Sequence, residues 1–302
     1  MTNDSPAQPA QPAPAAVAGA IYRADRVTLH RQDVLEGLAC LPDGAFDLAI
    51  ADPPYGASSD ADWGLERGHG LPGFGGPWRL ADHAWDRPGD SGRPERGRGG
   101  VGLPRKPPPV EAWLAELKRL VRPTGSIWIH ATYHNSGFVN VACQMSGLEI
   151  INEVVWYKRN AFPNLSGRRL TASHETILWV HTGGSRREYR FNYEAARTAS
   201  FPGDSLKQLG RQLRTVWDIP SNKTPAERRH GRHPTQKPLR LVERMLLVSA
   251  APGGRLLAPF AGSGTEMIAG RRFGLECVGF ESDPVYFELA VRRITDEVAT
   301  GR

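Results

Sequence analysis

Apolar and polar positions alternate with two different periods along most of this chain. Short runs of apolar residues are typical of strands in a covered sheet, and apolar residues three or four apart are typical of helices. Because the two kinds of element alternate, the sequence predicts an α/β domain with a mostly parallel sheet and helices on both faces. Strands are expected at residues 26–30, 46–51, 126–131, 150–157, 176–181, 256–257 and 276–281, and helices at 109–121, 239–249, 265–272 and 284–294.

Two segments lack this periodicity. Residues 1–22 are rich in Ala, Pro and Gln, and their four prolines would break an apolar signal helix. We therefore expect a disordered tail there rather than a secretion signal. Residues 56–109 are rich in Gly, Pro and Arg, and we interpret them as a long mobile loop, since loops of this length are usually functional or disordered.

The positive charge of the chain is concentrated in one segment. The formal net charge is +6, and residues 185–232 alone hold eleven cations and five anions, which gives the same net charge. Such a segment favours an anionic partner, because cations contact phosphates and aromatic rings stack on bases. A solvated basic face is the alternative interpretation. The aromatic residues among these charges are Tyr189, Phe191, Tyr193, Phe201 and Trp217.

Cysteine usage and hydropathy favour an intracellular protein. The three cysteines, Cys40, Cys143 and Cys277, are far apart and form no Cys-x-x-Cys pair. Neither a zinc site nor a disulfide framework is supported, and a reducing, cytoplasmic setting fits best. No apolar run is long enough to cross a membrane.

A glycine turn lies between the strand expected at 256–257 and the helix expected at 265–272. Such a turn lets the backbone approach a ligand closely, and the start of the helix offers free N–H groups. Glu281 lies nineteen residues after Gly262, at the end of the next expected strand, where an acid can accept hydrogen bonds from ribose hydroxyls. A polar strand end without a ligand is the alternative. The candidate residues are Phe260, Gly262, Ser263, Gly264, Thr265 and Glu281.

The order of the motifs resembles that of one enzyme family. Asp52-Pro53-Pro54-Tyr55 follows the strand expected at 46–51, and the glycine turn follows some two hundred residues later, after the hexapeptide His233-Pro234-Thr235-Gln236-Lys237-Pro238. This order resembles the beta-class DNA amino-methyltransferases. Their S-adenosylmethionine-dependent methyltransferase fold is Rossmann-like and circularly permuted. The resemblance covers most of residues 27–295.

The resemblance implies a role for the first motif in methylation of an exocyclic amine. The carboxylate of Asp52 and the carbonyl of Pro53 would accept the two amino hydrogens and stabilise the developing positive charge. Pro53 and Pro54 would stiffen this loop, and Tyr55 would offer a face on which the base stacks. The chemistry requires no metal. A rigid turn at a strand end is the alternative.

The resemblance also implies contacts of further residues. Asp33 would accept from the adenine amino group of the cofactor, although a helix-capping aspartate is an equal alternative. Thr235 and Lys237 would contact the carboxylate of S-adenosylmethionine. The segments near the target base would place Lys158, Arg169 and His174 at the DNA, with plain surface charges as the alternative.

One departure from the family pattern is plain. The family usually has Asp before Pro-Phe in the glycine motif, by the methionine part of the cofactor, whereas this chain has Ala258. Either a neighbour compensates, or cofactor binding is weak, or the chain is an inactive relic.

The sequence thus predicts a site-specific, base-flipping methyltransferase of double-stranded DNA that acts on adenine N6. The alternatives are cytosine N4, an RNA or protein amide as substrate, and a non-catalytic DNA-binding protein. The resemblance further implies a bacterial or archaeal nucleoid setting, a homodimer and a cognate restriction endonuclease. The expected domains are a tail (1–22), a catalytic half (23–184, with the loop 56–109), a target-recognition insertion (185–232) and a cofactor-binding half (233–302).

Overall fold

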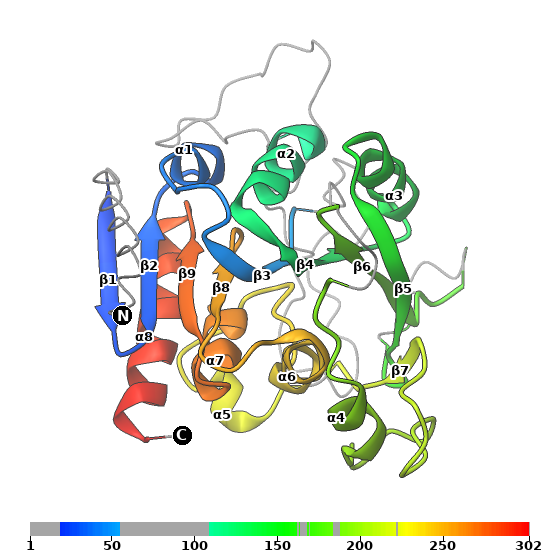
Figure 1. Ribbon diagram of the computed structural model, residues 1–302. Coiled ribbons are helices and arrows are strands. Elements are labelled where there is room, and N and C mark those ends of the chain that lie inside the picture. The colour runs from blue at the N-terminus through cyan, green and yellow to red at the C-terminus, as the bar shows by residue number, and fades with distance from the viewer. Residues whose placement is uncertain are drawn as a thin grey trace, which may run out of the picture.

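The computed structural model describes residues 19–54, 109–161, 163, 168, 170–183, 188–221 and 223–301. Within these ranges, nine strands form one sheet in the order β1-β2-β9-β8-β3-β4-β6-β5-β7 (Figure 1). None of the described helices is both long and apolar enough to span a membrane. The strands are β1 (Ala20–Ala24), β2 (Val27–Arg31), β3 (Phe46–Ala51), β4 (Val121–Ala131), β5 (Glu149–Tyr157), β6 (His174–His181), β7 (Val216–Asp218), β8 (Arg255–Ala258) and β9 (Glu276–Phe280).

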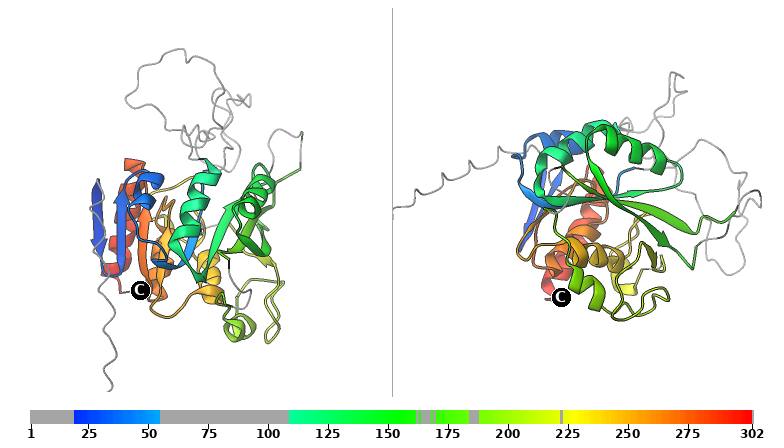
Figure 2. Two further views of the ribbon diagram at one scale, coloured as in Figure 1. Left: turned by 45° about the horizontal axis from the view of Figure 1, so that its top comes forward. Right: turned by 45° about the vertical axis from the view of Figure 1, so that its right-hand side comes forward.

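Helices cover both faces of the sheet, and each face has its own core (Figures 1 and 2). Helices α1 to α3 lie on one face, where Trp113 and Leu117 of α2 are fully buried. Helices α4 to α8 lie on the other face, where Met245 and Leu246 of α6 are fully buried. The helices are α1 (Val34–Ala39), α2 (Val110–Leu120), α3 (Ser136–Met145), α4 (Tyr193–Thr198), α5 (Pro225–Arg228), α6 (Leu239–Ser249), α7 (Thr265–Arg272) and α8 (Pro284–Ala299).

The sheet is mostly parallel, as the sequence predicts. Five of its neighbouring pairs are parallel (β2·β9, β9·β8, β8·β3, β3·β4 and β5·β7). The remaining three pairs, β1·β2, β4·β6 and β6·β5, are antiparallel. Strand β3 lies directly between β8 and β4, although β8 comes some two hundred residues later in the chain. The catalytic-motif strand and the cofactor-motif strand are therefore neighbours, which is the arrangement that a permuted fold requires.

Most expected elements are present, and some expectations are wrong in their bounds. Strand β3 and helices α6 and α7 have the predicted limits, and α8 continues past residue 294 to Ala299. The predicted end of the disordered tail, residue 22, is wrong, because β1 already begins at Ala20. This short strand becomes ordered by pairing with β2, and its Tyr22 hydroxyl hydrogen-bonds Thr295 of α8 at 2.8 Å. The loop expected at 56–109 lies outside the described residues, except for Pro109.

The described part of the basic segment packs against the rest of the fold. Strand β7 pairs in parallel with β5, and helix α4 contacts α6. Trp217 of β7 is only 2% exposed and packs near Trp128 of the central strand β4, with 5.8 Å between the ring centroids. The expectation that Trp217 stacks on a base is therefore wrong, because its ring is part of the core. Phe191 and Tyr193 remain exposed.

Candidate active site

The predicted motifs meet at one edge of the sheet. Asp52 follows β3, the glycine turn follows β8, and Glu281 follows β9. These three strands are adjacent and parallel, so their carboxyl ends open into the same crevice, which is the usual ligand site of open α/β sheets. Side chains far apart in the sequence are thus brought to one place.

Asp52 is held by a lysine of the hexapeptide. The Nζ atom of Lys237 lies 2.8 Å from Oδ1 and 2.7 Å from Oδ2 of Asp52, and it also donates to the carbonyl of Thr235 at 3.2 Å. The Lys237 side chain is 3% exposed and that of Asp52 13%. Burial alone would lower the pKa of Lys237, but the carboxylates of Asp52 and Glu175 outweigh burial and raise it. Lys237 is therefore an ammonium, and it fixes the orientation of the Asp52 carboxylate.

A second set of polar groups surrounds this ion pair. Oε1 of Glu175 accepts from Lys158 at 2.9 Å, and Oε2 lies 3.9 Å from Lys237. Oε2 of Glu175 and both ring nitrogens of His130 are buried without a hydrogen-bond partner among the described residues. Burial, and next the charge of Lys237, lower the pKa of His130 to about 3. His130 is consequently a neutral, fully buried imidazole.

The glycine turn has the conformation that its residues predict. Gly262 and Gly264 have φ values of +50° and +76°, a region that residues with a Cβ rarely adopt. The carboxylate of Glu281 accepts the N–H of Gly262 at 2.9 Å and that of Asp283 at 2.8 Å. Burial raises the pKa of Glu281 to about 7, although these backbone hydrogen bonds act to lower it. Glu281 thus braces the turn as well as standing at the expected ribose position.

The hexapeptide covers the glycine turn. A Cβ on Gly262 would lie 3.4 Å from Nε2 of His233, whose ring packs edge-on against Tyr286 with 4.2 Å between the centroids. Thr235 Oγ1 lies 3.3 Å from His233 Nδ1. The predicted residues Thr235 and Lys237 are therefore brought to the glycine turn and to Asp52 by the same short segment.

Glu266 is a member of this cluster that the sequence analysis missed. It is 3% exposed and lies in the first turn of α7, directly after the glycine turn. Burial, and next the negative charge of Asp52, raise the pKa of Glu266 to about 7, while Lys237 and Arg293 oppose this rise. An acid at the second helical residue after a Gly-x-Gly turn is a signal that could have found it, because a polar residue there lies on the ligand side of the helix start.

The remaining predicted residues have mixed surroundings. Asp33 is the N-cap of α1 and accepts from the N–H of Leu35 at 3.0 Å, so the capping alternative is present whatever else Asp33 binds. Lys158 lies in the ion pair with Glu175, and His174 is exposed at the first residue of β6. Among the other predicted site residues, Pro53 is buried, and Pro54 and Phe260 are half-buried. Tyr55 and Arg169 lie outside the described residues.

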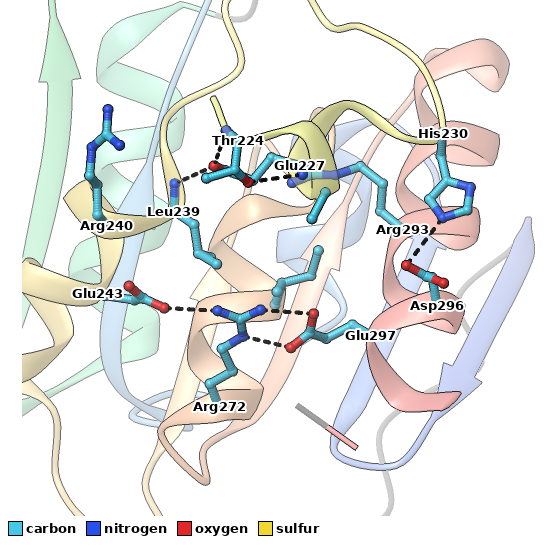
Figure 3. Close-up of a pocket in the computed structure, with 12 residues that line it drawn as sticks. Thr224, Glu227, His230, Leu239, Arg240, Glu243, Arg272, Arg293, Asp296 and Glu297 are labelled. Carbon is cyan, nitrogen blue, oxygen red and sulfur yellow. Dashed lines mark hydrogen bonds and ion pairs between the residues drawn. The ribbon is translucent and has the colours of Figure 1, made fainter. Parts of the chain in front are cut away.

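A cavity of about 430 Å³ lies behind the glycine turn, between α5, α6, α7 and α8 (Figure 3). Some of its charged groups pair with one another, as Arg272 does with Glu243 and Glu297. From this side Arg293 donates to the carbonyl of Ser263 and to Thr265 Oγ1, the latter at 3.1 Å. The cavity therefore supports the turn from behind and is separate from the cluster around Asp52.

The donor set fits S-adenosylmethionine. The positive-φ glycines allow close backbone approach, Glu281 offers acceptors for a ribose, and Phe260 offers an apolar face beside Trp113, with 5.7 Å between the ring centroids. Lys237 would supply a cation for the carboxylate of the methionine end. These residues would hold the cofactor.

Comparisons with known proteins agree with this geometry. Residues 46–292 match the model of the N6/N4 methyltransferase family, described as DNA methylase. The type II methyltransferase M2.DpnII of Streptococcus pneumoniae is 30% identical over 93% of this chain and 94% of its own. The crystal structure of an M1.HpyAVI–SAM complex has a TM-score of 0.55 at 20% identity, covering 89% of this chain and 98% of that one. The PvuII cytosine-N4-specific DNA methyltransferase has a TM-score of 0.63 at 14% identity, covering 94% and 95%.

Proposed function

The chain belongs to the N6/N4 DNA methylase family, whose members are S-adenosylmethionine-dependent methyltransferases, and we propose that this enzyme methylates N6 of adenine in double-stranded DNA. The observation that carries the proposal is the position of Asp52. Its carboxylate is fixed by Lys237 at the edge of the sheet where the glycine turn also lies.

The bound cofactor supplies an electrophilic methyl group on a sulfonium. The protein must present an amino nitrogen to it with the lone pair localised. The carboxylate of Asp52 and the carbonyl of Pro53 accept the two N–H groups, and their negative charge stabilises the cation that develops on the nitrogen. Because Lys237 holds both carboxylate oxygens of Asp52, the acceptor is already oriented before the base arrives.

The choice of adenine rests on the first residue of the motif. Asp at this position favours adenine N6 in the family, and Ser favours cytosine N4. Cytosine N4 is the second candidate, since the PvuII enzyme with a similar fold is cytosine-N4-specific. The test is to incubate the protein with mixed-sequence duplex DNA and S-adenosylmethionine, digest the DNA and identify the methylated nucleosides by mass. N6-methyladenine supports the proposal, and N4-methylcytosine overturns the choice of base.

The target base must leave the helix to reach Asp52. Flipping costs a few kcal/mol, of which stacking on Tyr55 offsets about 1–3 kcal/mol. The proposed DNA contacts are the basic residues 185–232 together with Lys158, Arg169 and His174. The loop expected at residues 56–109 lies outside the described residues, and its proposed role is to take part in DNA binding. Deleting residues 93–105 should then weaken DNA binding and turnover, and unchanged binding and turnover would refute this role.

Asp52→Asn tests the catalytic assignment. It should abolish turnover while cofactor binding, measured by calorimetry, stays within a few-fold of wild type. The matched control is Asp25→Asn, which removes a carboxylate that pairs with Arg271 at the surface, 2.9 Å away. If Asp52→Asn retained turnover, the central role of Asp52 would be wrong. If wild type bound S-adenosylmethionine but methylated only RNA or a protein amide, the DNA substrate would be wrong. No cofactor binding at all would favour a non-catalytic DNA-binding protein.

The same family membership suggests two partners, a second copy of the chain and a restriction endonuclease. M2.DpnII is named as a type II methyltransferase, which supports a restriction-modification role for this chain. Light scattering of the purified protein tests the homodimer. Protection of methylated DNA against endonucleases that cut at the methylated sequence tests the restriction-modification role.

A further inference from the structure

Glu266, like Glu281, has no cation of its own among the described residues, but Glu281 accepts the backbone N–H groups of Gly262 and Asp283. Asp52 pairs with Lys237, and Glu175 pairs with Lys158. By contrast, no lysine, arginine or histidine nitrogen of the described residues lies within 4.0 Å of the Glu266 carboxylate. A buried anion without a paired cation is costly, and such groups are kept where a ligand completes them.

Other buried polar groups of the active site also lack hydrogen-bond partners. Both nitrogens of the fully buried His130, and Oε2 of Glu175, lack hydrogen-bond partners among the described residues. The charge of Lys237 acts on both His130 and Glu266, and Oε2 of Glu175 lies 3.9 Å from Lys237, so these groups lie around the same ion pair. A neutral imidazole nitrogen and Oε2 of Glu175 can each accept a hydrogen bond, so the surroundings of the ion pair offer acceptors to a ligand that donates them.

The position of Glu266 in the fold limits which part of a ligand it can reach. It follows the positive-φ glycine turn by two residues and lies in the first turn of α7, where the helix start stabilises a carboxylate. Glu281, at the expected ribose position, follows β9 and contacts the turn at its first glycine, Gly262. The end of β8 offers no competing acid, because it is Ala258, which is fully buried.

We propose that the Glu266 carboxylate binds the α-ammonium group of S-adenosylmethionine, and so supplies the acid that Ala258 does not. This inference rests on the proposed function, because it assumes that the glycine turn holds that cofactor. The α-ammonium is a cation with three N–H donors, which matches one buried carboxylate without a cation and its neighbouring acceptors. Lys237 remains with Asp52 and the cofactor carboxylate.

The test compares two ligands by calorimetry at pH 8. The first is S-adenosylhomocysteine, which carries the α-ammonium and cannot react. The second is its analogue with a hydroxyl in place of the amino group. Wild type should bind the first roughly 30-fold more tightly, as expected for a buried charged hydrogen-bond partner. Glu266→Gln should lose most of this preference by binding S-adenosylhomocysteine more weakly, while its affinity for the analogue stays nearly unchanged.

Glu281→Gln is the matched control, since it removes a second buried carboxylate beside the same turn. It should weaken the binding of both ligands by a similar factor, because both carry the ribose. A thermal melt of each variant verifies that it is folded. If Glu266→Gln kept the full preference for S-adenosylhomocysteine, or weakened both ligands equally, the inference would be wrong. If wild type bound neither ligand, the cofactor assignment itself would fail, which separates the two claims.

Discussion

Replacing Glu266 with Gln should stabilise the ligand-free protein at neutral and alkaline pH. The pKa of Glu266 is raised from an ordinary value of 4.5 to about 7, first by burial and then by Asp52. Below pH 4.5 the carboxyl group is protonated in both the folded and the unfolded chain. Between pH 4.5 and about 7 only the unfolded chain releases the proton, so folding stability falls as the pH rises through this window. Gln resembles the protonated acid and has no such loss.

The size of the effect follows from the pKa. One pKa unit corresponds to about 1.4 kcal/mol, so a rise from 4.5 to about 7 corresponds to about 3 kcal/mol at pH 8. Because Glu266 is only 3% exposed, solvent screening reduces this figure little. Glu281 has a raised pKa too, but it is present in both proteins and cancels in the difference.

The assay is urea unfolding of wild type and Glu266→Gln, without cofactor, at pH 5 and pH 8. The variant should be more stable by less than about 1 kcal/mol at pH 5, where the unfolded chain has only begun to gain from losing the proton, and by about 3 kcal/mol at pH 8. Glu276→Gln, on the exposed side of β9, is the control and should differ from wild type by less than about 0.5 kcal/mol at both pH values. A difference that does not change with pH, or a variant less stable at pH 8, would show that the folded protein stabilises the ionised Glu266 carboxylate and that its pKa is not raised.

Three further predictions concern the same region. Lys237→Met should destabilise the protein by about 3–5 kcal/mol, because it leaves the buried carboxylate of Asp52 uncompensated. Adding Asp52→Asn should recover part of this loss. If the effects of the two substitutions were additive in urea unfolding, the ion pair would be contradicted. Gly262→Ala should lower the free energy of unfolding by about 1–2 kcal/mol, because the φ of +50° is unfavourable for alanine. It should also weaken S-adenosylhomocysteine binding in calorimetry. Unchanged stability and unchanged binding would show that the turn relaxes freely. Leu257→Ala, at a fully buried position of β8, should lower the free energy of unfolding by about 2–5 kcal/mol in thermal or urea unfolding. It should not change the preference for the ligand with the α-ammonium group. A change in that preference would show that the cofactor site depends on core packing.

Much of the fold could be predicted from local patterns. The bounds of β3, α6 and α7 follow from runs and spacings of apolar residues, and the glycine turn from two glycines between a strand and a helix. Strand β1 could not be predicted in this way, because it is ordered by pairing with β2 rather than by its own sequence. The side chain of Trp217 was misjudged for a related reason, since local charge suggested an exposed ring and packing against Trp128 buries it.

Local patterns along the chain indicate which chemistry this protein carries. The residues of the catalytic motif, the glycine turn and the hexapeptide can each be identified locally, and their order along the chain indicates the permuted fold. How these groups pair depends on the three-dimensional fold. Lys237 was expected at the cofactor carboxylate and lies on Asp52, and Glu266 was not expected at all. Pairing and burial of charges depend on distances between residues about 200 positions apart, and those distances are set by the neighbouring positions of β3 and β8 in the sheet.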